Sequence, residues 1–293
     1  MIDLTEPFQF EFFRHALVAA TMVGALTGLV GVYVVLRRMS YIGHGMSHAV
    51  FGGAVVGYVA GFNFYLAAGA WGFVSALLIN QTSRRRGIGA DAAIGIITTA
   101  SFALGVALIS RAHSVTRNFD AALFGNLLAV DRSDIFVIAV VLAATIAFLF
   151  FFYKQLLFLT FDPEVAPIYG VRATLIDTLF SLVLAATIIA SIRIMGVTLI
   201  AASLIIPPVI ARLLTDRFAA MLILSAALGS VIGFAGMFLS YYFDIASGAS
   251  IVLLAAGLFA LTLVYVSVRN AVRVGRPGSE RAELPTEARA LLD

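Results

Sequence analysis

The stretch "ALVAATMVGALTGLVGVYVVL", residues 16 to 36, decides what kind of fold this chain adopts. It contains no charged residue. Its length matches the roughly 20 residues that an α-helix needs to cross a hydrocarbon core of about 30 Å. In that core only a helix or a closed barrel satisfies its own backbone hydrogen bonds, and the stretch lacks the two-residue alternation of a barrel strand. It therefore predicts a transmembrane helix.

Similar apolar runs recur along the rest of the chain. Hydrophobic residues make up 61% of the 293 residues and charged residues only 12%, which is far from the balance of a soluble protein. We predict an all-α, polytopic transmembrane helix bundle of nine helices, or of eight if the crowded region 41–80 is divided differently. The nine predicted spans are residues 16–36, 41–61, 64–80, 92–110, 134–153, 174–192, 195–213, 218–242 and 249–268.

The distribution of the charged residues predicts the orientation of the chain in the membrane and does not indicate a site for a charged ligand. The net charge is +3, but the basic residues are spread over loop ends instead of one face, so nucleic-acid binding is not indicated. The excess of arginine at one set of loops, such as Arg37 and Arg38, predicts that these loops and the C-terminus are cytoplasmic. We expect a transmembrane domain at 1–268 and a flexible cytoplasmic tail at 269–293. With no cysteine, the chain has no disulfide framework and no thiolate metal site.

A polar stretch, "RRMSYIGHGMSHAVFGG", residues 37 to 53, follows the first span. On a helix, His44 and His48 are one turn apart on the same face, with Ser47 close to it. Ionisable groups within spans are functional candidates, and neutral imidazole is a common ligand of zinc-like divalent ions. We predict a transient metal site at His44 and His48; hydrogen bonds from each histidine to a neighbouring helix are the alternative.

The same stretch does not fit an enzyme. A zinc protease helix has the pattern HExxH, in which the glutamate activates water, but Gly45 follows His44 here. Ser47 is not in a G-x-S-x-G nucleophile elbow either. We therefore expect a protein without covalent chemistry.

Other polar or helix-breaking residues mark candidates for a passage or a gate. Pro207 and Pro208 lie inside an apolar span, where they remove two backbone donors and are expected to kink or break the helix near Ser203. Broken helices often line cavities, although such a kink can be purely architectural. Asp244 follows the eighth span, where it either attracts cations at an external mouth or caps the ninth helix.

One connection predicts a contact with a soluble partner. In "FLTFDPEVAPIYGVRATLI", residues 158 to 176, Asp162 can N-cap a short helix with Pro163 at its first position and Glu164 in its first turn. Gly170 can end that helix. A short rigid helix between two spans suits docking onto another subunit, and an ordinary interfacial turn is the alternative.

Six ordered motifs, which together cover residues 14 to 268, resemble the permease subunits of bacterial ABC importers for zinc, manganese and iron ions. The motifs are "GLVGVYVVLRRMSYIGHGMSHAVFGG", "DAAIGI", "LFGNLLAV", "FDPEVAPIYGV", "GVTLIAASLIIPPVIARLL" and "SYYFDIASGASIV". The resemblance implies a homodimeric pore in the bacterial cytoplasmic membrane, two ATPase subunits docked at Asp162–Gly170, and an extracytoplasmic metal-binding protein. ATP would bind to the partner subunit, since the chain has no G-x-x-x-x-G-K-[ST] phosphate loop. No covalently bound cofactor is expected.

The resemblance has one departure, at the first histidine. The family often has aspartate at the position of His44, so that a carboxylate and an imidazole form the pair. Two imidazoles make a softer site, which favours zinc over manganese without deciding between them. Two ligands also hold an ion weakly, as transport requires.

Two other functions remain compatible with parts of the sequence. An ion-gradient-driven secondary metal transporter would need a protonatable carboxylate within the membrane, and the sequence offers Asp177 near an edge. A membrane scaffold without transport would leave His44 and His48 without a role in metal uptake.

Overall fold

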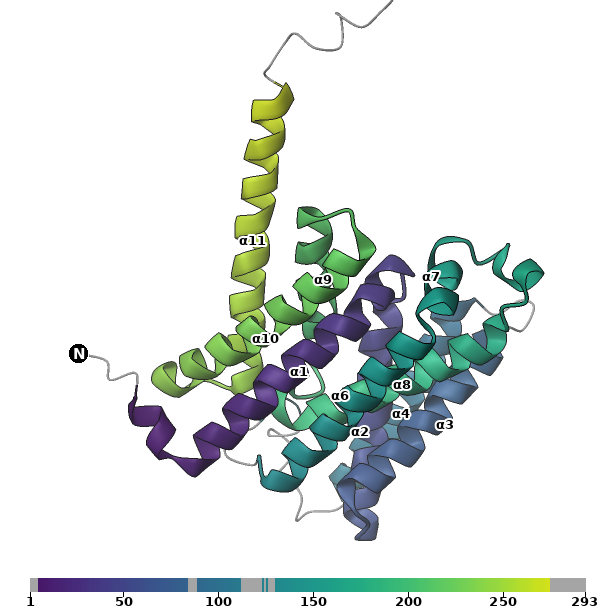
Figure 1. The fold of residues 1–293 in the computed structure, drawn as a ribbon. Helices are drawn as coiled ribbons and strands as arrows, with labels where there is room; N and C mark the ends of the chain where they lie inside the picture. Colours follow the sequence, from purple (N-terminus) through teal and green to yellow (C-terminus); the bar gives the residue numbers. More distant parts are fainter. Residues whose placement is uncertain (1–4, 84–88, 112–122, 124, 126–129, 275–293) are drawn as a thin grey trace, which may run out of the picture.

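The computed structural model describes residues 5–83, 89–111, 123, 125 and 130–274, and this part of the chain contains helices and no strand (Figure 1). The helices in chain order are η1 Glu6–Gln9, α1 Glu11–Leu36, α2 Ser40–Ala60, α3 Phe64–Ser83, α4 Ala90–Arg111, α6 Arg132–Phe151, α7 Tyr153–Phe161, η3 Ala166–Tyr169, α8 Ala173–Met195, α9 Ile200–Leu214, α10 Phe218–Phe243 and α11 Ser247–Val274. Residues 269–274 of the expected tail belong to α11, and 275–293 lie outside the described residues.

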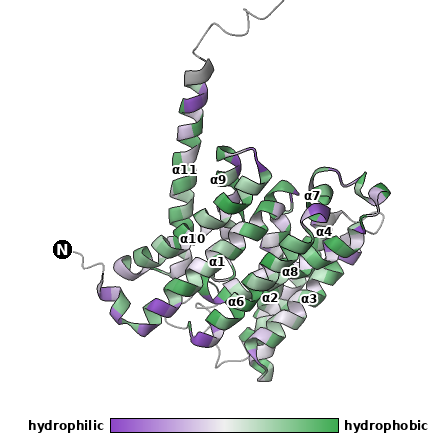
Figure 2. Cartoon of the chain, viewed as in Figure 1, coloured by the Kyte–Doolittle hydropathy of each residue, from purple (hydrophilic) through white to green (hydrophobic). Residues whose placement is uncertain are grey.

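Within the described residues, seven helices are long and apolar enough to cross a membrane: α1, α3, α4, α6, α8, α10 and α11. Hydrophilic residues gather near helix ends and connections, while the helix bodies are largely hydrophobic (Figure 2). Two of the predicted spans are not among the seven. They correspond to α2, which carries the two histidines, and to α9, which has only 15 residues. The all-helical, polytopic fold is therefore confirmed, and the count of eight or nine spans remains a prediction.

Helices α1 and α10 pack with their backbones in close contact. A Cβ atom added to Gly24 would lie 2.0 Å from the carbonyl oxygen of Gly229, and one added to Gly28 would lie 2.4 Å from that of Ser225. The Ser225 hydroxyl also donates a 2.7 Å hydrogen bond to the carbonyl oxygen of Gly28. Small residues are what permit this approach, because apolar lipid offers no hydrophobic driving force and helix association depends on close packing.

The proline pair does not break α9, which runs without interruption through Pro207 and Pro208. The irregular backbone lies earlier, at residues 196–199, between α8 and α9. Pro208 has no N–H to donate to the carbonyl four residues before it, that of Leu204. A Cβ added to Gly31 would lie 2.0 Å from this carbonyl oxygen. The acceptor that the proline leaves unused therefore faces α1 instead of a cavity.

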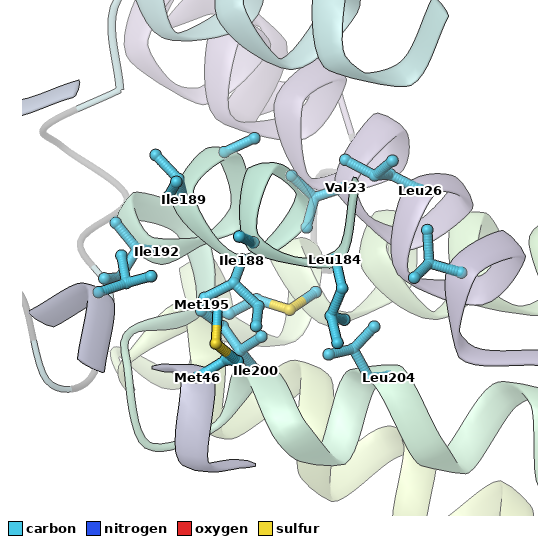
Figure 3. Packing of buried hydrophobic residues seen from close by; sticks show 14 of the residues in the cluster. Val23, Leu26, Met46, Leu184, Ile188, Ile189, Ile192, Met195, Ile200 and Leu204 are labelled. Atoms are coloured by element: carbon cyan, nitrogen blue, oxygen red, sulfur yellow. The ribbon is translucent and has the colours of Figure 1, made fainter. Parts of the chain in front are cut away.

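Helix α2 is held between α3 and α4. A Cβ added to Gly52 would lie 2.1 Å from the Ser101 carbonyl oxygen of α4, and Gly53 and Gly57 meet side chains of α3. On another face, Met46 is 1% exposed and joins the core between α2, α8 and α9, which Figure 3 shows around Leu184. These contacts fix the rotation of α2 and leave the histidine-bearing face of its first half without cover from α3.

Replacing Gly24 by alanine is expected to destabilise the chain, because the added Cβ would overlap the backbone of α10. Overpacking of this kind costs about 1–3 kcal/mol. The matched control is Gly69→Ala in α3, where a Cβ meets nothing within 4 Å and helix propensity improves by up to about 1 kcal/mol. Thermal unfolding in detergent should give a lower melting temperature for Gly24→Ala and an unchanged or higher one for Gly69→Ala. Equal melting temperatures for the two variants would contradict the close packing.

Candidate metal-binding site

His44 and His48 lie together on the outer face of α2, as their spacing predicts. Their ring centroids are 4.8 Å apart and the ring planes are 87° from parallel. The His44 residue is exposed and His48 is half-buried. Because a zinc–nitrogen bond is about 2.0–2.1 Å long, rings at this separation are close enough for their nitrogens to share one ion.

The surroundings of His48 leave one nitrogen free for an ion. The ring packs edge-to-face against Phe102 of α4, with centroids 4.9 Å apart. Its Nδ1 atom is buried and has no hydrogen-bond partner among the described residues, whereas Nε2 is not among the buried unpartnered atoms. Of the two nitrogens, Nε2 is thus the one that is not both buried and unpartnered, and it is the candidate ligand atom.

The described residues contain no group of three or more His, Cys, Asp or Glu side chains that could hold a metal ion. One chain thus offers two imidazoles at this place and no third ligand of these types within the described part. A site with two protein ligands cannot close the tetrahedral shell of a structural zinc site. Further ligands have to come from water or from another molecule.

The two serines predicted near the passage are engaged in helix contacts. Ser47 is fully buried, and its hydroxyl donates to the carbonyl oxygen of His44 at 2.7 Å. Ser203 of α9 is buried against α1, where its hydroxyl lies 2.9 Å from that of Thr27. Their role in a passage remains a prediction.

The remaining pore candidates are the two prolines, within α9, and Asp244, at the end of α10. Pro207 and Pro208 are buried in α9. Asp244 is exposed at the C-terminus of α10, where it adopts the left-handed conformation with φ 51°. Its backbone N–H donates to Ser240, so Asp244 ends α10. The start of α11 lies three residues later, at Ser247.

The predicted docking segment is helical over a shorter range than expected. Asp162 directly follows α7 and its side chain makes no cap, and residues 163–165 form a turn that includes Pro163 and Glu164. The helical part is η3, which Gly170 ends with φ 78° as predicted. Two apolar side chains of η3 protrude: Ile168 is 81% exposed and Tyr169 is 74% exposed.

A cavity of about 340 Å³ lies behind α2, on the face opposite the histidines. Met46 and Ile42 of α2 form one wall, and polar groups include Arg37, which directly follows α1, and Asp177 of α8. Arg37 and Asp177 form an ion pair across these two helices. Asp177, which the sequence offered as a protonatable carboxylate, is therefore paired with a cation.

The sequence did not point to another paired carboxylate, Asp134 of α6, which is buried. It is fully buried and accepts hydrogen bonds from Arg193 of α8 at 2.8 and 2.9 Å and from the hydroxyl of Tyr65 in α3.

Asp134 also forms a capping box with Asp131 at the start of α6. The hydrogen bond from Ser133 is the main cause that lowers the pKa of Asp131. The spacing D-x-x-D before an apolar run is the sequence signal for this box.

Removing the charge of Asp134 is expected to destabilise the bundle strongly. The Asp134→Asn change would remove the anion that accepts two hydrogen bonds from Arg193. Breaking a fully buried pair costs about 3–5 kcal/mol, and the cost here is smaller because the Arg193 side chain is 34% exposed. The control is Glu11→Gln, which breaks the pair between Glu11 and Arg132, whose side chains are 59% and 82% exposed; exposed pairs contribute little. Melting temperatures should fall for Asp134→Asn alone. A similar small effect of both changes would argue against a structural role for the buried pair.

Comparison with known proteins is consistent with a transport protein. The chain is 38% identical over 256 residues to the manganese transport system membrane protein MntC of Halalkalibacterium halodurans, an alignment that covers 87% of this chain and 88% of that protein. It is 33% identical over 266 residues to a probable iron transport system membrane protein of Haemophilus influenzae, with 91% and 98% covered.

Solved structures agree with the fold. The structure described as PsaBC from Streptococcus pneumoniae in complex with Fab contains a chain that matches with a TM-score of 0.79 and 35% identity, covering 87% of this chain and 92% of that one. An inward-facing putative metal-chelate type ABC transporter shares the fold at a TM-score of 0.71 and 17% identity. A sequence model of the ABC 3 transport family matches residues 9–266. The chain therefore belongs to the ABC 3 transport family.

Proposed function

We propose that this chain is the membrane-spanning permease subunit of an ATP-driven importer of divalent transition-metal ions, zinc or manganese, in the bacterial cytoplasmic membrane. Two copies of the chain form the passage, and metal moves by alternating access while partner ATPases hydrolyse ATP. An extracytoplasmic binding protein delivers the ion. In this arrangement α2 and α9 also lie within the membrane, which gives nine spans.

The observation that carries this proposal is the exposure of His44 on α2, one helical turn from the half-buried His48. Polar groups that face hydrocarbon are costly, and ionisable residues within spans face a cavity or a partner. A second copy packed on this face, in the symmetric manner usual for homo-oligomers, would cover the rings. It would also bring two further imidazoles to the same place, which supplies the ligands that one chain lacks.

The choice of metal draws on two considerations that point in different directions. The relatives with the names quoted above are a manganese and a probable iron transport protein. Imidazole ligands, in contrast, suit zinc better than manganese, which prefers carboxylate and water. The proposal therefore includes both zinc and manganese, and the relative uptake of the two ions is an experimental question.

ATP hydrolysis is assigned to a separate chain, because the sequence has no phosphate loop and no Gly-Lys pair. We assign the docking contact to residues 162–170. The protruding Ile168 and Tyr169 support this, since exposed apolar side chains next to polar residues are typical of protein contacts. A secondary carrier is less well supported, because Asp134 and Asp177, two carboxylates near helix ends, are each paired with arginine.

Loss of either imidazole is expected to abolish most of the metal uptake. His44→Ala and His48→Ala should each reduce uptake of radioactive zinc or manganese at least roughly tenfold, since even an outer-shell partner of a metal site contributes about 10–100-fold. The control is His15→Ala, a histidine of α1 that lies near Glu11. Assembly with the ATPase should be unchanged in all three. Normal uptake by the His44→Ala and His48→Ala variants would exclude the proposed site.

His44→Asp is expected to shift selectivity from zinc toward manganese. The change replaces one imidazole by a harder oxygen ligand, so the ratio of manganese to zinc uptake should rise relative to the unchanged chain. Uptake measured with both ions in competition, in proteoliposomes that contain the whole transporter, gives this ratio directly. An unchanged ratio would mean that residue 44 does not contact the ion.

A further inference from the structure

His48 lacks a contact that metal-bound histidines usually have. Such histidines almost always donate their second ring N–H to a carboxylate, a carbonyl or water, which fixes the ring and makes it a stronger ligand. In His48 the Nδ1 atom is buried and has no hydrogen-bond partner among the described residues. Two rings lie against this imidazole: that of Phe102, at 4.9 Å and 77° between planes, and that of His44, at 4.8 Å and 87°.

The position of Phe102 is itself fixed by the contact between α2 and α4. Next to it in sequence, Ser101 places its carbonyl oxygen 2.1 Å from where a Cβ on Gly52 would lie, and a Cβ on Gly105 would lie 3.0 Å from the Cα atom of Gly52. The Phe102 ring also packs on Phe51 of α2, with centroids 5.4 Å apart. Because backbones meet on both sides of residue 102, α4 cannot slide along α2 without losing these contacts.

We infer that Phe102 is a positioning residue for metal transfer: it orients the His48 ring with Nε2 toward the exposed face, and it does so without offering an acceptor to Nδ1. This inference rests on the proposed function and deepens it. An oriented ring that lacks the outer-shell hydrogen bond remains a weak ligand. Weak holding suits a conduit, which must release each ion.

Two substitutions at residue 102 test this role: one adds a hydrogen-bond acceptor and the other removes the aromatic ring. Phe102→Gln supplies an acceptor for the Nδ1–H, so zinc should bind about tenfold more tightly, with a lower KM and a lower kcat for transport. Phe102→Leu keeps an apolar cover but removes the ring, so zinc should bind about two- to tenfold more weakly, the range expected from an aromatic pair. The matched control is Leu104→Gln, which puts the same amide on an exposed position of α4.

Zinc affinity and transport kinetics of the whole transporter in lipid nanodiscs and proteoliposomes measure these effects. Opposite shifts of affinity for Phe102→Gln and Phe102→Leu, with Leu104→Gln unchanged, support the inference, because a purely structural role would weaken binding in both variants or in neither. Unchanged affinity in the Phe102 variants, or losses in both, overturns it. When the Phe102 variants give such a negative result, the histidine variants show which claim is wrong. If His44→Ala and His48→Ala reduce uptake, only the role of Phe102 is wrong. If they leave uptake unchanged, the proposed function is wrong as well.

Discussion

A hydrocarbon core has no water that could complete a hydrogen bond, and this constraint orders the whole chain. Backbone groups are satisfied within helices, and some charged side chains form ion pairs with partners on neighbouring helices. Asp134 with Arg193 and Asp177 with Arg37 are examples at opposite ends of α8. His44 differs from these residues, because its imidazole is exposed and its ring contact is with His48 of the same helix. The proposed passage follows from that exception.

The glycine contacts determine how α2, which carries the exposed His44, is oriented in the bundle. Gly24 and Gly28 hold α1 on α10, and Gly31 meets the Leu204 carbonyl that Pro208 leaves without its usual donor. Gly52 fixes α2 against α4 in the same way. With α2 held on two sides, His44 lies exposed and His48 packs on Phe102 of α4. Close packing between helices thus determines the orientation of the helix that carries His44 and His48.

Local patterns could be predicted from the sequence, and long-range contacts could not. The shared helix face of His44 and His48, the all-helical fold and the helix end at Gly170 all depend on nearby residues and are confirmed. The predicted start of the docking helix, at Pro163, is wrong, because η3 begins only at Ala166. The sequence could not decide between the two starts, since Pro163 and Pro167 are both compatible with a first turn. Phe102 could not be singled out, since it is one of 24 phenylalanines and its contact with His48 joins different helices.

The central claim is that a second copy of the chain covers the histidine face, and cysteine cross-linking tests it most directly. The chain has no cysteine, so a single His44→Cys change gives a thiol without background. The account predicts that mild oxidation of the assembled transporter joins two copies through residue 44, and that Leu66→Cys, at a 73% exposed position of α3, gives no such product. Cross-linking at residue 66 but not at residue 44 would contradict a passage between the two histidine faces.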